Sequence, residues 1–202
     1  LANNSACSST CYSNVKYAKA ELWDQDTVSS DDLLGTSYLD AYGNVKFSNI
    51  GVSEVGTNQD IYIKLYSINS AAEVSSSVGS TNAKGSVYTW TTSVVTNVAS
   101  GVYSYGTQSI VNNGAALNIM TTLLDSRSYS NTYGSSNIAQ LDSRWPRSDG
   151  STGAYFWTNG GSHIVLYDGF DATVNFHEYA HYVGDYYSSH TGGGGAHTLN
   201  SC

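Results

Sequence analysis

The sequence predicts an α+β protein in which a β-rich part precedes a part that contains helices. From about residue 15 to residue 100, apolar and polar side chains alternate in short runs separated by turn residues. From residue 107 onward, apolar side chains recur instead at helical spacing. Because composition and period change near Gly101, we expect a domain boundary there. Residues 1–14 would form an N-terminal segment, 15–100 a β-domain and 101–202 an α+β domain.

We expect the strands of the first domain to be short and separated by Asp, Ser, Gly and Asn residues that favour turns. The pattern is clearest where Ile61, Ile63 and Leu65 alternate with Tyr and Lys side chains. The expected strands lie at 15–23, 33–39, 45–47, 60–66 and 87–90. Four or more strands of this size predict a small β-sandwich.

In the second domain we expect two helices. Leu117 and Leu124 belong to an apolar stripe that predicts an amphipathic helix over 107–127. The second helix opens at Asp171, whose side chain suits an N-cap, and Gly184 marks its expected end. Strands are expected between the helices, at 154–157 and 163–167.

Charge and composition favour a secreted protein. Only 12% of the residues are charged, about half the usual share in soluble domains, and the net charge is −8. This acidic balance argues against binding a phosphate backbone or an anionic membrane, so we expect neither nucleic acid nor a membrane as partner. No apolar run approaches the length of a membrane helix, and the first residues lack a signal-peptide pattern. We therefore expect a processed chain or a fragment.

The three cysteines lie at the two ends of the chain. Because the chain is poor in charge and has no second cysteine pair, we expect Cys7 and Cys11 to form a disulfide rather than a zinc site. Cys202 is then left over, and we expect its partner in a neighbouring molecule or beyond residue 202. A bridge from Cys202 to Cys7 or Cys11 is the alternative.

Three runs between residues 19 and 47 follow one another in a distinctive order. They are KAELWDQD (19–26), DDLLGT (31–36) and DAYGNVKF (40–47). A strand, an acidic connection, an Asp-Asp-Leu-Leu-Gly turn and an Asp-x-x-Gly hairpin in this order resemble the transthyretin-like sandwich domains of secreted proteins. The resemblance implies a sandwich fold for 15–100.

Four carboxylates interrupt the strand pattern of the first domain: those of Asp24, Asp26, Asp31 and Asp32. Oxygen ligands of this kind bind calcium when they converge. The alternative is a solvated strand connection that charge keeps soluble.

The chemistry of the chain is concentrated in the run His-Glu-Tyr-Ala-His, residues 177–181, on the second helix. Histidines four residues apart project from one face about 6 Å apart, so His177 and His181 can bind one Zn²⁺. Glu178 is rotated by about 100° from His177 and can act as a general base on water rather than bind the metal. The core-facing stripe of this helix is expected at Phe176, Ala180 and Val183.

The stretch 119–183 places a helix, an edge-type strand at 163–167 and the metal helix in one order, and GGGGAH (192–197) follows. This arrangement resembles the gluzincin clan of secreted metallopeptidases, in which His-Glu-Tyr-x-His-x-Val precedes a glycine-rich loop and a histidine. The resemblance implies the N-terminal half of a zincin-type catalytic domain. It also implies a third zinc ligand from a glutamate on a further helix, but no glutamate follows Glu178.

Three explanations for this missing ligand remain open. The ligand lies beyond Cys202 in a longer protein, which we rank first because Cys202 is also left unpaired; a residue within the chain replaces it; or the site is inactive. The spacing His181-x-x-Gly-x-x-Tyr187 imitates a metzincin pattern, but tyrosine is a poor primary ligand. Other internal candidates, without a spacing rule, are His190, His197 and Asp185. We expect His163 to be a structural or rim residue.

We therefore expect a secreted zinc-dependent endopeptidase with Glu178 as general base for a zinc-activated water. Its partner is a peptide or protein substrate, which strand 163–167 would bind as an added antiparallel strand. The competing hypothesis is an extracellular structural or adhesive subunit that self-associates and retains an inactive metallopeptidase fold. Exposed strands and an unpaired cysteine would join its copies.

Overall fold

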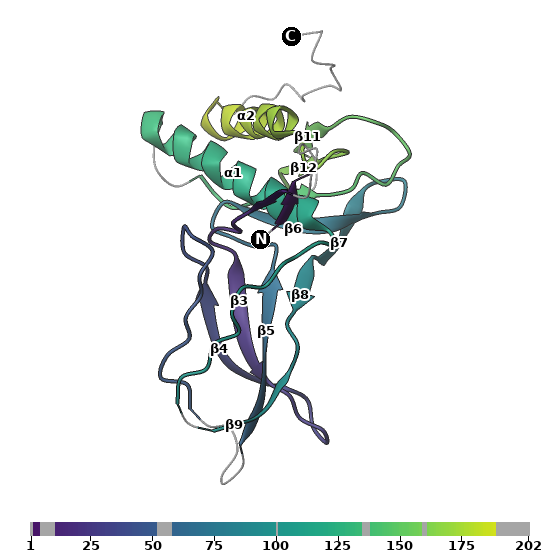
Figure 1. The fold of residues 1–202 in the computed structure, drawn as a ribbon. Coiled ribbons are helices and arrows are strands. Elements are labelled where there is room, and N and C mark those ends of the chain that lie inside the picture. The colour runs from purple at the N-terminus through teal and green to yellow at the C-terminus, as the bar shows by residue number, and fades with distance from the viewer. Residues whose placement is uncertain are drawn as a thin grey trace.

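The computed structural model describes residues 2–4, 11–51, 58–99, 101–134, 138–158 and 161–188. In this part of the chain there are two helices, α1 (Gly114–Tyr133) and α2 (Ala172–Ser188), two five-stranded sheets and a small strand pair. The helices lie over one sheet at one end of the molecule, and the other sheet extends away from them (Figure 1). The α+β class is confirmed. No described helix has both the length and the apolar character needed to cross a bilayer.

The first five-stranded sheet is antiparallel throughout. Its strands are β3 (Lys19–Asp24), β4 (Asp32–Tyr38), β5 (Gln59–Tyr66), β8 (Thr89–Thr91) and β9 (Val95–Val98). They are ordered β4-β3-β5-β8, and β9 continues along β5 beyond β8. Ala20, Leu22 and Ile61 are buried on one face of this sheet. The expected strand at 45–47 is wrong, because these residues form a loop.

The second five-stranded sheet is mixed and lies under the helices. Its strands are β6 (Ala72–Val78), β7 (Ala83–Val87), β10 (Leu141–Arg144), β11 (Tyr155–Trp157) and β12 (His163–Val165). They are ordered β11-β12-β10-β6-β7. The pairs that β10 makes with β6 and with β12 are parallel, and the outer pairs are antiparallel. The remaining strands, β1 (Ala2–Asn4) and β2 (Cys11–Ser13), pair with each other.

Strands from segment 15–100 enter both large sheets, which differs from the expected β-domain that ends near Gly101. β6 and β7 belong to the sheet that contains β12, far along the sequence. The expected strand at 87–90 is divided at Tyr88, with Val87 in one sheet and Thr89 in the other. Alternation predicts which residues share a face of a strand but not which strand lies beside it. The two sheets therefore do not divide the chain near residue 100.

One hydrophobic core joins the two parts of the chain. Val15, Ala20 and Leu39, from the N-terminal part, belong to the same cluster of buried side chains as Ile119 of α1 and Tyr182 of α2. Because the cluster is continuous, the first sheet, the second sheet and the helices share a core.

The predicted helix at 107–127 is present but begins and ends later, at Gly114 and Tyr133. Asn113 has a left-handed backbone with φ 54°, which interrupts the helix on its N-terminal side. Beyond residue 127 the sequence is polar, and hydroxyl groups donate to carbonyl oxygens four residues earlier, as Ser130 does to Ser126 at 3.0 Å. An apolar stripe could not reveal these polar turns.

Candidate metal centre

The helix that carries the His-Glu-Tyr-Ala-His run begins where the sequence predicts. The backbone N–H of Val174 donates to Oδ1 of Asp171 at 3.1 Å, so Asp171 is the N-cap. The expected end at Gly184 is wrong, because α2 continues to Ser188. Glycine lowers helix stability but does not end a helix when the following residues keep helical dihedrals.

The buried face of α2 is formed by Asn175, Glu178, Tyr179 and Tyr182, which recur at helical spacing. The expected stripe at Phe176, Ala180 and Val183 is therefore corrected at two positions: Phe176 is 44% exposed and Ala180 is exposed, whereas Val183 is partly buried and packs against the core. The two tyrosines turn inward because their rings fill the space above the second sheet. Tyr182, for example, contacts Phe156 of β11 with 6.1 Å between ring centroids.

His177 and His181 are brought together on a flank of this buried face. Their Nε2 atoms lie 3.1 Å apart, and their rings are nearly perpendicular, with centroids 4.7 Å apart. Two nitrogens that each lie about 2.1 Å from one tetrahedral ion are separated by about 3.4 Å. The two nitrogens are thus within hydrogen-bonding distance of each other and close to the spacing that two ligands of one Zn²⁺ ion would have.

Glu178 directly follows His177 in the sequence and is only 6% exposed. Its position on the helix directs it toward the buried face, while His177 and His181 remain partly exposed. A carboxylate that is shielded from bulk water and next in sequence to such a histidine is a candidate general base.

The described residues do not supply a third ligand. No group of three or more His, Cys, Asp or Glu side chains suited to a metal ion occurs in the ranges that the structure describes, so Asp185 does not complete the pair. Tyr187 lies at the end of α1, with its hydroxyl 3.1 Å from where a Cβ on Gly134 would be. His190 and His197 lie outside the described residues.

His163 lies on the opposite face of the second sheet from α2. Its neighbour Ile164 packs into the core beneath the helices, and successive side chains of a strand point to opposite faces. His163 is 6% exposed, and its Nδ1 is 2.8 Å from the carbonyl oxygen of Gly161. Burial lowers the pKa of this imidazole. It does not join the histidine pair.

The expected edge strand at 163–167 is an interior strand. β12 is bordered by β10 on one side and by β11 on the other, so among the described strands β11 forms the edge next to α2. The sequence predicted a strand at 154–157 but not its place. Its Tyr-Phe-Trp run is short, and Trp157 at its end is exposed. Nothing in the sequence indicates which strand pairs with it.

The four aspartates of the acidic connection do not converge on one point. The Asp24 carboxylate accepts from the N–H of Asp60 at 2.8 Å, and Asp31 accepts from the N–H of Asp26 at 3.3 Å. All four lie in a described range, and no three carboxylates there form a metal group. These bonds order the strand connection.

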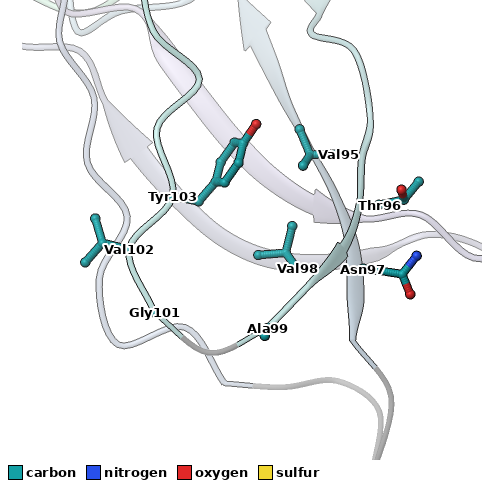
Figure 2. Close-up of a pocket in the computed structure, with 8 residues that line it drawn as sticks. All are labelled: Val95, Thr96, Asn97, Val98, Ala99, Gly101, Val102 and Tyr103. Carbon is teal, nitrogen blue, oxygen red and sulfur yellow. The ribbon is translucent and has the colours of Figure 1, made fainter.

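A separate open cavity of about 280 Å³ lies beside β9, at the other end of the molecule from α2 (Figures 1 and 2). It is lined by Val95, Thr96, Asn97, Val98, Ala99, Gly101, Val102 and Tyr103. In Figure 2 the side chains of Val98 and Tyr103 turn toward the space between the two segments, while Thr96 and Asn97 turn away. No carboxylate, imidazole or thiol side chain is among these lining residues.

The expected cysteine pairing falls outside what the structure describes, because Cys7 and Cys202 are not described and only the backbone of Cys11 is. Comparison of the chain with protein-family models, with curated proteins and with solved structures finds no match. The histidine pair and its geometry therefore carry the functional argument.

Proposed function

We propose that this chain belongs to a secreted zinc-dependent endopeptidase. The observation that carries the proposal is the 3.1 Å separation of the His177 and His181 Nε2 atoms on α2. Glu178, which lies between these histidines in the sequence, is buried. A catalytic zinc site uses three protein ligands, so we place the third outside the described residues. The extracellular location rests on composition.

The roles of the residues follow from their positions. His177 and His181 would hold Zn²⁺, which when bound supplies Lewis-acid polarisation of the peptide carbonyl. The Glu178 carboxylate takes a proton from water as the water oxygen bonds to the carbonyl carbon. Glu178 then passes that proton to the amide nitrogen as the C–N bond breaks, which releases an amine and a carboxylic acid, and the acid ionises by losing its remaining proton to solvent.

The substrate would lie along β11 rather than along β12. β11 is at the edge of the sheet and contacts α2 through Phe156 and Tyr182, so an extended peptide can add a strand there. Main-chain pairing of this kind tolerates many substrate sequences.

The test measures zinc content and hydrolysis of an unfolded protein substrate by the full chain. We expect about one zinc per chain, loss of zinc in His181→Ala, and retained zinc with about a thousandfold loss of activity in Glu178→Gln. Asp125→Asn, an exposed change on α1, is the matched control and should keep both properties. Unchanged hydrolysis by Glu178→Gln would rule out the proposal.

A further inference from the structure

The first sheet has a second face, opposite the core, that carries aromatic and charged side chains. Because Ala20 and Leu22 point into the core, their neighbours Lys19, Glu21 and Trp23 point to the other side. The strand register arranges this face, which we name the aromatic face, in three rows. The rows are Tyr38–Lys19–Tyr66, Thr36–Glu21–Lys64 and Leu33–Trp23–Tyr62 across β4, β3 and β5.

The aromatic face is open to solvent along its β4 and β8 edges, although Glu21 at its centre is only 6% exposed. At its β4 edge, Tyr38 is 56% and Leu33 is 50% exposed. Thr36 on β4 and Thr91 on β8 are also exposed, and Trp23 is partly exposed in the middle. Since the core lies on the other side of the sheet, these rings do not serve its packing.

Carboxylates on the same face hold the rings in fixed positions. Glu21 accepts from Trp23 Nε1 at 3.1 Å and from the Tyr66 hydroxyl. Asp31 accepts from the Tyr62 hydroxyl at 2.7 Å. Each ring is thus tethered at its polar end, so a ligand that stacks on it loses little side-chain entropy on binding.

The charges of the aromatic face balance. Lys19 pairs with Glu21 at 2.6 Å, and Lys64 lies 5.4 Å from the centroid of the Tyr66 ring. With Asp31, the face has two positive and two negative groups, whereas the chain has a net charge of −8. Neither a polyanion nor a polycation is complementary to such a surface.

We propose that the aromatic face is a binding site for an uncharged polysaccharide. Successive rows on a strand are about 6.7 Å apart, so the two aromatic rows are about 13 Å apart with a polar row between them. Rings stack on the C–H faces of sugars, and the Lys64 ammonium and Thr36 hydroxyl of the middle row can bond to sugar hydroxyls, while the buried Glu21 holds the rings in place. This site is independent of the proposed peptidase centre and would keep the protein on a polymer.

The test measures retention of the full chain on regenerated cellulose, chitin and insoluble starch, with soluble alginate as an anionic comparison. We expect binding to at least one neutral polymer, weakened about tenfold by Trp23→Ala and by Tyr62→Ala. Thr36→Arg should weaken binding similarly without risk to folding, since Thr36 is exposed. Tyr129→Ala removes a ring that is 68% exposed on α1 and is the matched control.

Three outcomes would overturn the proposal. These are no retention on any neutral polymer, retention that Thr36→Arg and Trp23→Ala leave unchanged, and salt-sensitive binding to alginate alone. A fourth, a monomer–dimer change in Thr36→Arg without loss on the polymers, would assign the face to self-association instead.

Discussion

Tyr179 and Tyr182 lie one turn apart on the buried face of α2 and differ in what their hydroxyl groups bind. The Tyr182 hydroxyl donates to the carbonyl oxygen of Ala139 at 3.1 Å. The Tyr179 hydroxyl is buried without a hydrogen-bond partner in the part of the chain that the structure describes. Burial accordingly raises the pKa of Tyr179.

This difference predicts unequal effects of removing the two hydroxyls. Tyr182→Phe should lower the free energy of unfolding by about 1 kcal/mol, because the Ala139 carbonyl loses its donor. Tyr179→Phe should leave that free energy unchanged or raise it, since an unsatisfied buried group is removed. Urea denaturation of both variants measures the effect, and equal losses would contradict the structure.

The buried imidazole of His163 predicts a pH dependence of stability. Burial lowers its pKa below the ordinary value of 6.5, although the Gly161 carbonyl partly opposes this. As pH falls through about 6.5 toward the lowered value, the unfolded chain binds a proton that the folded chain does not. The free energy of unfolding should therefore fall over this range, and His163→Gln should lose that part of the slope. Equal slopes for both proteins between about pH 8 and about pH 5 would show that His163 contributes nothing.

The spacing of the two candidate histidines was the most predictable feature of the candidate site. The spacing of His177 and His181 follows from helix geometry alone, and the structure brings their nitrogens together. The burial of Glu178 was not predictable, because it depends on which side of α2 meets the sheet. The sequence does not indicate that side, because Phe176 and Ala180 are apolar but exposed. The buried side carries tyrosines, which are common both on surfaces and in cores.

At the scale of elements, the start of α2 depends on one side chain. Asp171 Oδ1 accepts from the Val174 N–H at 3.1 Å, which satisfies a backbone donor that the helix itself leaves without a partner. Asp171→Ala should lower the free energy of unfolding by about 1 kcal/mol, whereas Asp171→Asn should retain most of it. Thermal denaturation distinguishes the two; a similar loss in both would indicate that charge, and not the cap, stabilises this end.

Elements were predictable where apolar residues alternate or recur, and not where small polar residues fill buried positions. β5 alternates strictly and lies close to its expected bounds. β6 contains Ser75, which is fully buried in the middle of the second sheet, and its serine-rich sequence resembles a loop. Such a strand is fixed by its neighbours β7 and β10 rather than by its own propensity.

At the scale of the molecule, the sequence predicted both helices and some of the strands, but it missed β6, β9 and β10 and did not predict how the strands share sheets. The parallel pairing of β6 with β10 joins residues about seventy positions apart. No local pattern encodes a contact of that separation, because register depends on the completed core. The same pairing makes independent folding of 15–100 unfavourable, since it would leave the edge of β6 that faces β10 unpaired.

The shared core therefore predicts a single cooperative unfolding transition. Leu39 follows β4 and is 8% exposed within the cluster that includes Ile119 and Tyr182. Leu39→Ala should lower the free energy of unfolding by about 2–5 kcal/mol. Although both helices lie after residue 113, the substitution should also lower the midpoint of their unfolding, measured by circular dichroism at the helix band. Val28→Ala, at a side chain that is 98% exposed, is the control and should leave the midpoint unchanged. If the helices unfolded at the same midpoint in Leu39→Ala as in the parent protein, the two parts of the chain would be separate folding units.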